Sequence, residues 1–509
     1  MRDLDDALAR WRALLGGERV IDEPAALRAA EAATFATGQR VPAIVRPRTR
    51  DEVAAVLTIA SKCGVPVYPV SRGCNWGLGS RVPAADGCAL LDLAGLNAIT
   101  HFDEELACMT VEPGVTFRQA HAFLAARGSR LFVSATGSSP DASLVGNALE
   151  RGDGAGPLGD RWAHVCALEA VLTTGEVVRT GFARFGDVPA ATAHRWGVGP
   201  SLDGLFSQSN LAVITRMTVW LAPLPRSIQA LRFRLRDDDA LPALVDALRG
   251  LRLDGTLRAT ASLWNDLRVW SVEGRAGDAE GLAGFRRETD HARWFGLTGL
   301  YAPTELMGRA AREHAASVIA PLVDSWRCEE RAGDPAAGRE LLWEAEPAFG
   351  FLQGVPHEMS LRSAYWHKPA TPTAALDPDR DRCGVVWACA AVPFRGRDVL
   401  RALVIARDEL AAHGFDPMLA VATQSERAAS VLPTLLYDRD VEGDDARAMR
   451  CHDALLARYA AEGWLPYRLG VHSMGALPAA TDDSRAVLGR IKAAMDPTGV
   501  LAPGRYDRG

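Results

Sequence analysis

A glycine-rich run after a short apolar segment constrains this chain more than any other feature of its sequence. The run reads PVSRGCNWGLGS at residues 69–80, and the preceding VPVYPV is typical of a strand. No helical pattern follows, so the main-chain N–H groups of this loop can converge on an anion such as a diphosphate. The spacing fits neither GxGxxG nor GxxxxGK(S/T), which argues against a Rossmann or P-loop site. A simple turn is the alternative interpretation.

A second segment, SLVGNALERGDGAGPLGDRW at residues 143–162, is also rich in glycine and poor in apolar residues. Glycine costs about 0.5–1 kcal/mol relative to alanine, so it tends to persist where something approaches the main chain closely. Two such segments predict one extended ligand. The alternative, that both are surface loops, fits residues 152–159 better than Val145 to Asn147.

Composition excludes several classes of protein. At about 150 residues per domain, 509 residues predict two or three folding units, and 48% apolar with 24% charged residues is an ordinary globular balance. The net charge of −6 argues against nucleic-acid binding. No apolar run approaches the roughly 18 residues of a membrane span, and the N-terminus is acidic, so we expect a soluble, cytoplasmic protein. The nine cysteines are scattered, which predicts reduced thiols.

Helix and strand patterns alternate in the first part of the chain. Thr49 with Glu52 predicts a helix over 50–63 that Gly64 ends, and Thr116 with Gln119 begins another that Gly128 closes. The remaining patterns predict strands at 65–70, 88–93 and 108–113, a hairpin over 167–181 and a long strand over 211–223.

The pattern changes after Pro225, where a second domain is expected to begin. Longer helices are predicted near 237–250, 305–320, 397–413 and 445–462, between strands such as LRATASLW and CGVVWACAAV. The last 45 residues return to short strands and a helix.

Seven motifs in a fixed order resemble one family. They are PVSRGCNWGLGS, VEPGVTF, PDASLVGNALERG, VGPSLDGLFSQSNLAVITRMTVWLAP, LLYDRD, EGWLPYR and DPTGVLAPGRY. Together they resemble the FAD-binding oxidoreductases related to vanillyl-alcohol oxidase and the flavoprotein subunit of 4-cresol dehydrogenase. The resemblance covers most of residues 40–225 and 415–509 and is weak between them.

The resemblance implies an α+β, two-domain PCMH-type FAD-binding fold with a central α+β cap domain. Residues 1–224 and 465–509 would form the FAD-binding domain, and residues 225–464 the cap, or substrate, domain. By the same resemblance, the residues that bind FAD are Ser71, Arg72, Gly73, Cys74, Asn75, Trp76, Gly77, Ser80, Pro140, Ser143, Gly146, Asn147, Ala212, Val213, Ile214 and Arg505.

The resemblance also implies a reaction, in which a hydride passes from a substrate carbon to flavin N5. Tyr467 and Arg468 match the pair that holds the phenolate oxygen of phenolic substrates, since a fixed guanidinium favours the anion. Asp141 matches a carboxylate near N5 that suits a general base. Without the flanking match, Tyr467 would be a core residue, Arg468 part of a surface ion pair and Asp141 a turn residue.

Three departures from the family pattern qualify this expectation. Leu78 stands where phenol-binding relatives carry a second tyrosine, which argues against a simple para-alkylphenol substrate. Residues 383–393 contain no His or Tyr that could tether FAD covalently, so we expect non-covalent FAD, with Cys389 as a remote alternative. Nothing identifies a docking partner for electron transfer, so the electron acceptor is dioxygen or another, unassigned acceptor.

The substrate pocket is the least constrained part of the prediction. Its candidate residues are Leu78, Trp366, His367, Trp387 and His472, with His472 expected on the same strand as Tyr467. Trp264, Trp294 and Tyr365 are further candidates, although aromatic residues more often belong to a core.

Together these features predict an FAD-dependent oxidoreductase for a small, aromatic or specialised-metabolite substrate, as in a tailoring step of biosynthesis. The alternatives are a redox-neutral lyase or isomerase and a non-catalytic binding protein of the same fold. We expect no metal, no nucleic-acid or membrane partner, and a homodimer, because relatives are commonly dimers.

Overall fold

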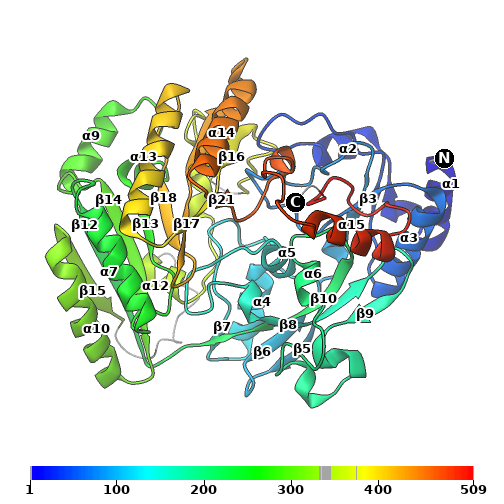
Figure 1. Ribbon diagram of the computed structural model, residues 1–509, viewed down its shortest axis with the longest axis horizontal. Helices are drawn as coiled ribbons and strands as arrows, with labels where there is room; N and C mark the ends of the chain where they lie inside the picture. The colour runs from blue at the N-terminus through cyan, green and yellow to red at the C-terminus, as the bar shows by residue number, and fades with distance from the viewer. Residues whose placement is uncertain (1–2, 332–333, 335–345, 374, 508–509) are drawn as a thin grey trace.

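The computed structural model describes residues 3–331, 334, 346–373 and 375–507. Helices and strands form two lobes that lie side by side, and both ends of the chain lie in the same lobe (Figure 1). Strands up to Pro223 build the first lobe, and strands from Ser227 to Pro466 build the second. This arrangement confirms the predicted α+β class.

The first lobe begins with a four-stranded sheet. Its elements are β1 (Val20–Ile21), β2 (Ile44–Val45), β3 (Val67–Val70), β4 (Ala89–Asp92), α1 (Leu4–Leu15), α2 (Pro24–Ala30) and α3 (Arg50–Cys63). The strand order is β1-β2-β4-β3, and β4 pairs in parallel with both neighbours. The Thr49 hydroxyl accepts the Glu52 N–H at 3.1 Å, and Gly64 follows α3 with a φ of 64°. Both ends of the predicted helix are therefore confirmed.

A five-stranded antiparallel sheet completes the first lobe. Its elements are β5 (Ile99–Asp103), β6 (Cys108–Val111), β8 (Val165–Val171), β9 (Val177–Arg179), β10 (Val213–Trp220), α4 (Phe117–Ala126), α5 (Leu144–Leu149), α6 (Asp203–Phe206) and α15 (Ser484–Met495), with a small separate pair of β7 (Leu131–Phe132) and β11 (Ala222–Pro223). The order β5-β6-β10-β8-β9 contains the predicted hairpin as β8 and β9. The long predicted strand is β10, which lies at the centre of the sheet.

The second lobe is an eight-stranded antiparallel sheet. Its strands are β12 (Ser227–Leu235), β13 (Ser262–Asn265), β14 (Trp294–Ala302), β15 (Ser325–Glu330), β17 (Ala390–Pro393), β18 (Ala420–Thr423), β19 (Ala428–Val431) and β21 (Leu465–Pro466), beside a separate pair of β16 (Cys383–Trp387) and β20 (Thr434–Asp438). Its helices are α7 (Leu241–Leu253), α8 (Asp266–Trp270), α9 (Ala279–Glu288), α10 (Glu305–Ile319), α12 (Pro347–Leu352), α13 (Gly396–Ala412) and α14 (Asp444–Ala461). Apolar residues of α7, α10, α13 and α14 share one core with the sheet.

The predicted helices of the second half are confirmed as α7, α10, α13 and α14, with ends shifted by a few residues. The strand expected within LRATASLW is shorter and lies at Ser262–Asn265. β21, just after the predicted domain limit at 464, pairs with β17 in the sheet of the second lobe. The limits at 224 and 464 stay predictions.

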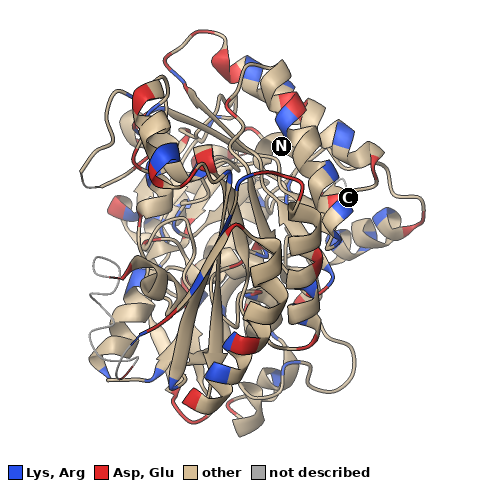
Figure 2. Cartoon of the chain, turned by 90° about the vertical axis from the view of Figure 1, so that its left-hand side faces the viewer, with Lys and Arg blue, Asp and Glu red and all other residues tan. Residues whose placement is uncertain are grey.

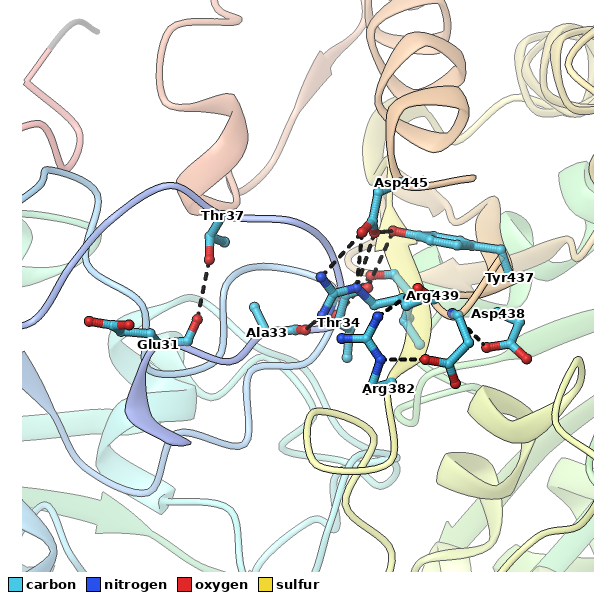
Figure 3. A network of polar contacts seen from close by, with 12 residues as sticks. Glu31, Ala33, Thr34, Thr37, Arg382, Tyr437, Asp438, Arg439 and Asp445 are labelled. Carbon is cyan, nitrogen blue, oxygen red and sulfur yellow. Dashed lines mark hydrogen bonds and ion pairs between the residues drawn. The ribbon is translucent and has the colours of Figure 1, made fainter. Parts of the chain in front are cut away.

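Thr34 ties the first lobe to the second. Its hydroxyl donates to the carbonyl of Val385 on β16 at 2.8 Å and accepts the N–H of Gly77 at 2.9 Å. Its carbonyl accepts the N–H of Val385 at 3.0 Å. Figure 3 shows the neighbouring contacts, in which Arg439 donates to the carbonyl of Ala33 and pairs with Asp445. The glycine-rich loop is thus held against the second lobe.

Charges of both signs are interspersed along the outer helices of the second lobe (Figure 2). This mixture agrees with a small net charge and gives no single-sign surface there. None of the helices in the described ranges is long and apolar enough to cross a membrane.

Candidate active site

A cavity of about 450 Å³ lies where the two lobes meet. Its first-lobe wall includes the glycine-rich loop and α5, and its second-lobe wall includes residues of β13, β16, β18 and β20. On that wall Ser262 pairs with Ala422, and Trp387 pairs with Thr434, so that neighbouring strands present adjacent side chains to the cavity. Neither lobe encloses this space alone.

The glycine-rich loop can approach a ligand with its main chain. In the described ranges, the N–H groups of Arg72 to Asn75 have no protein acceptor, and these residues line the cavity. Gly73 and Gly77 have φ angles of 71° and 79°, which favour glycine. A Cβ on Gly77 would lie 2.0 Å from the ring of Trp387, so this glycine permits close packing of the loop on β16.

The second glycine segment forms the neighbouring wall through α5. The Ser143 hydroxyl accepts the Gly146 N–H at 2.9 Å at the start of the helix and donates to the carbonyl of Pro113. A Cβ on Gly146 would lie 2.8 Å from the Ser71 hydroxyl, which brings the two glycine segments into contact. This contact places the two segments on one cavity, as the prediction of a shared ligand requires.

Tyr467 and Arg468 enter the cavity directly after β21. The Tyr467 N–H donates to the carbonyl of Cys389 at 3.2 Å, and the Arg468 guanidinium donates to the Asn75 side chain at 3.2 Å. Burial raises the pKa of Tyr467 well above its usual range, so its hydroxyl is a hydrogen-bond donor at neutral pH. Arg468 Nε is buried and has no partner among the described residues, which leaves a donor for a bound molecule.

The structure does not bring Asp141 into the cavity. Its carboxylate accepts two hydrogen bonds from Arg118, each at 3.0 Å, and its side chain is 42% exposed. The Arg118 guanidinium holds the pKa of Asp141 below its usual range. The predicted role as a base beside the flavin is therefore not supported by the geometry.

Asp153 is an acidic residue of the cavity that the sequence alone did not single out. It lines the cavity between Gly152 and Gly154, and burial raises its pKa despite the nearby charges of Arg161 and Arg468. Glu150 also lines the cavity, but it is bonded to Arg505 and Tyr506. The glycine pattern already indicated that this segment approaches a ligand. Asp153 is its one aspartate with a glycine on each side, and this could have marked it as a candidate residue.

Several predicted pocket residues lie elsewhere. Leu78 is buried, with its carbonyl bonded to Val471, and Gly77 and Pro140 support the cavity wall without lining it. The Trp366 indole donates to Asp416, which His367 also approaches. His472 lies in a short 3₁₀ turn, not on a strand, and packs between Phe35 and His452. The prediction that these residues line the pocket is therefore corrected, because tertiary packing places them outside the cavity.

The other predicted residues do line the cavity. They are Ser71, Arg72, Gly73, Cys74, Asn75, Trp76, Ser80, Ser143, Gly146, Asn147, Ala212, Val213, Ile214, Trp387, Tyr467, Arg468 and Arg505. Trp264 lines it as well, whereas Trp294 and Tyr365 belong to buried cores. Arg268 of α8 also faces the cavity, and nothing in its sequence context indicated this.

Fold and cavity together define a protein of two lobes with a shared cavity, and comparisons with known proteins identify its class as flavoproteins. Residues 41–181 match the FAD binding domain family. The chain is 46% identical to 1'-carboxy-chondrochloren decarboxylase of Chondromyces crocatus, over 99% of this chain and 97% of the relative. It is 27% identical to the 4-cresol dehydrogenase flavoprotein subunit of Pseudomonas putida, over 99% and 95%.

A solved structure extends the match to three dimensions. The crystal structure of p-cresol methylhydroxylase with bound substrate superposes with a TM-score of 0.88 at 26% identity, covering 99% of this chain and 96% of the other. The chain belongs to the PCMH-type family of FAD-binding oxidoreductases. The unpaired N–H groups of the glycine-rich loop fit the diphosphate of FAD, the cofactor of this family.

Proposed function

We propose that this protein is an FAD-dependent enzyme that oxidises a small aromatic or specialised-metabolite substrate and releases its carboxyl group as CO2. The observation that carries the proposal is the cavity, which joins the glycine-rich loop to Tyr467, Arg468 and an aromatic second-lobe wall. Identity to a decarboxylase over nearly the whole of both chains supports loss of a carboxyl group.

In the first half of the catalytic cycle, in which the substrate is oxidised, atoms and electrons balance without a further co-substrate. The substrate loses a hydride from one carbon and CO2 from the neighbouring carbon, and the electron pair of the broken C–C bond forms a double bond. When bound, FAD supplies the two-electron acceptor for that hydride. Dioxygen or another acceptor would complete the cycle.

The chain's own residues have distinct parts in this proposal. The N–H groups of Arg72 to Asn75 hold the diphosphate, and the walls of both lobes exclude water. The protonated Tyr467 and the charged Arg468 bind a substrate oxygen and stabilise negative charge on it. Such donors act more strongly once a bound substrate displaces water from the cavity.

We also propose that FAD is bound without a covalent link. Burial raises the pKa of the Cys389 thiol to about 12, so it is protonated at neutral pH and is a poor nucleophile. The flavin should therefore stay in the supernatant after acid precipitation, and a yellow pellet would contradict this.

A redox-neutral decarboxylase is the second candidate, because the name of the 46% identical relative gives decarboxylation and mentions no oxidation. It would use the same cavity, and the bond to CO2 would be replaced by a bond to a proton. The two candidates differ in whether the flavin ends reduced.

The test mixes the purified holoenzyme without oxygen with 3-(4-hydroxyphenyl)propanoate. Oxidative decarboxylation should bleach the flavin and yield one CO2 and one 4-hydroxystyrene per flavin. A redox-neutral reaction would give CO2 and 4-ethylphenol with the flavin still oxidised. Absence of both CO2 and bleaching, with this acid and its shorter and longer homologues, would contradict both candidates.

A tyrosine pair tests whether the cavity performs the reaction. Tyr467→Phe should slow flavin reduction by about 10²-fold, because one hydrogen-bond donor to developing charge is lost. Tyr301→Phe is the matched control, since the Tyr301 hydroxyl is buried against the carbonyl of Leu352 away from the cavity. Equal effects of the two substitutions would argue against the assigned site.

A further inference from the structure

Arg268 is a cation on the second-lobe wall of the cavity without a matching acid. It lies on α8, and its guanidinium donates one hydrogen bond, at 2.5 Å, to the Ser363 hydroxyl. Its Cζ lies 5.6 Å from the ring centroid of Trp387. Among the described residues no carboxylate forms an ion pair with it, so the cavity contains an unneutralised charge.

Two acids near Arg268, one in the sequence and one in the cavity, form ion pairs with other arginines. Asp266, on the same helix, pairs with Arg286 at 2.7 Å, and Glu150, which lines the cavity, pairs with Arg505. Burial alone lowers the pKa of Arg268 to about 10, with no contribution from a nearby charge. Asp153, by contrast, is influenced by Arg468. The cationic region around Arg268 is therefore distinct from the charged region around Asp153 and Arg468.

Arg268 is partly buried on the cavity wall, and a guanidinium that loses water there is costly unless an anion or several hydrogen bonds compensate it. The neighbours of Arg268 supply one hydroxyl and an aromatic face, which hold the group in place but do not neutralise it. The Ser363 hydroxyl donates in turn to the carbonyl of Ser360 at 2.9 Å, so its oxygen is oriented to accept from Arg268. The position is preorganised for an anionic ligand.

We infer that Arg268, positioned by Ser363 and Trp387, binds the carboxylate of the substrate. The inference rests on the proposed function, because that function requires a substrate with a carboxyl group. A planar guanidinium can bind both carboxylate oxygens at once. It also keeps the acid ionised in a cavity that would otherwise favour the neutral form, and the ionised acid is the form that can lose CO2.

The two charged regions define the shape of the ligand. One end of the substrate contacts Tyr467 and Arg468, and the carboxylate contacts Arg268 of α8 at another part of the cavity wall. This second anchor also offers a physical account of Leu78. The chain lacks the second phenol-binding tyrosine of its relatives, and an ion pair at the other end of the substrate compensates for the lost contact.

The test measures binding without turnover. The holoenzyme is titrated calorimetrically with 4-hydroxycinnamate and with its neutral amide, 4-hydroxycinnamamide. Neither ligand has a saturated carbon that can give up a hydride, so binding does not depend on the oxidation. The same titrations are made with Arg268→Gln, with Arg268→Lys and with Arg362→Gln. Arg362 is a nearby arginine that does not line the cavity, and its substitution makes the same change in net charge.

Arg268→Gln should weaken binding of the acid by about 30-fold or more and change binding of the amide by less than about 3-fold. Arg268→Lys should retain part of the preference for the acid, and Arg362→Gln should retain all of it. Flavin absorbance of each variant shows whether FAD is still bound.

Three results would overturn the inference. They are equal affinity of the wild type for acid and amide, no binding of the acid, and equal loss of both ligands in Arg268→Gln. The last result, together with loss of flavin absorbance, would assign Arg268 to the cofactor instead. If the acid is preferred but no substrate bleaches the flavin or releases CO2, the proposed function fails and the carboxylate site stands.

Discussion

Tyr467 and Asp153 reach one cavity from distant parts of the chain, and burial acts on both in the same direction. It disfavours the charged form of each side chain, so the pKa of each is raised. For Tyr467 the result is a hydrogen-bond donor at all pH values of interest. For Asp153 the result is a carboxyl that can take up a proton more readily than an exposed aspartate. Its position beside Arg468 is suited to proton exchange with a substrate hydroxyl.

The residue-scale prediction compares the two aspartates. Asp153→Asn should slow anaerobic flavin reduction by about 10²-fold, because a proton acceptor in the cavity is lost. Asp141→Asn should leave the rate nearly unchanged and cost at most about 1 kcal/mol of stability, since its ion pair with Arg118 is solvent-exposed.

The pH profile adds a second measurement for the same pair. If the reaction needs ionised Asp153, its rate rises with pH through a pKa above the ordinary aspartate value, and Asp153→Asn removes this limb. A larger loss in Asp141→Asn than in Asp153→Asn would restore Asp141 as the catalytic carboxylate.

At the scale of elements, the loop between β3 and β4 is shaped by what packs against it. Gly77 combines a φ of 79° with direct contact to the Trp387 ring, and its N–H is bonded to Thr34. These contacts come from the second lobe and from the N-terminal segment. The loop is therefore held in place by parts of the chain distant from it in sequence.

Gly77→Ala should destabilise the protein more than a matched glycine substitution does. Gly463→Ala is the control, since Gly463 has a φ of 80° and open space around it. The control should cost about 1 kcal/mol for the backbone conformation, and Gly77→Ala about 1–3 kcal/mol more for the clash with Trp387. Denaturant unfolding of the apoprotein measures both, and flavin retention should fall in Gly77→Ala alone. Equal costs would contradict the packing argument.

At the scale of the whole molecule, the lobes meet at a buried aromatic cluster that includes His472. His472 follows the strand that leaves the second lobe, and it packs on His452 of α14 and on Phe35 of the N-terminal segment, at centroid distances of 4.6 and 4.4 Å. Burial, and then the charge of His452, lower the pKa of His472 to about 3, although Asp453 acts in the opposite direction. The folded protein thus keeps His472 neutral.

This contact should make the fold sensitive to acid. Below pH 6.5, the ordinary pKa of histidine, His472 binds a proton in the unfolded chain but stays neutral in the folded chain. The free energy of unfolding therefore falls as the pH falls from about 6.5. At pH 5 the loss should reach about 2 kcal/mol relative to neutral pH. His472→Phe, which keeps an aromatic ring, should remove this loss, and His101→Phe at an exposed position should not. Unfolding curves at pH 5 and pH 7.5 give the loss of stability in each variant. If His472→Phe loses as much stability at pH 5 as the wild type does, this prediction is wrong.

The sequence by itself determined the local elements and the family. Capping residues and hydrophobic periodicity are local signals, and they placed α3, α4, the hairpin and the helices of the second lobe within a few residues. The ordered motifs indicated FAD and singled out Tyr467, Arg468 and most residues of the glycine-rich loop. In the structure these residues line the cavity between the lobes.

Only the tertiary structure decided which side chains face that cavity. Asp141 and Asp153 both follow small or turn-forming residues, but the Asp141 carboxylate pairs with Arg118 outside the cavity whereas Asp153 lines the cavity. The residues next to Arg268 in the sequence do not indicate its role. Arg268 lacks an ion-pair partner among the described residues because the nearby acids pair with other arginines. The direction of a side chain and the charge around it depend on contacts between distant segments, and these exist only once the two lobes have closed on one another.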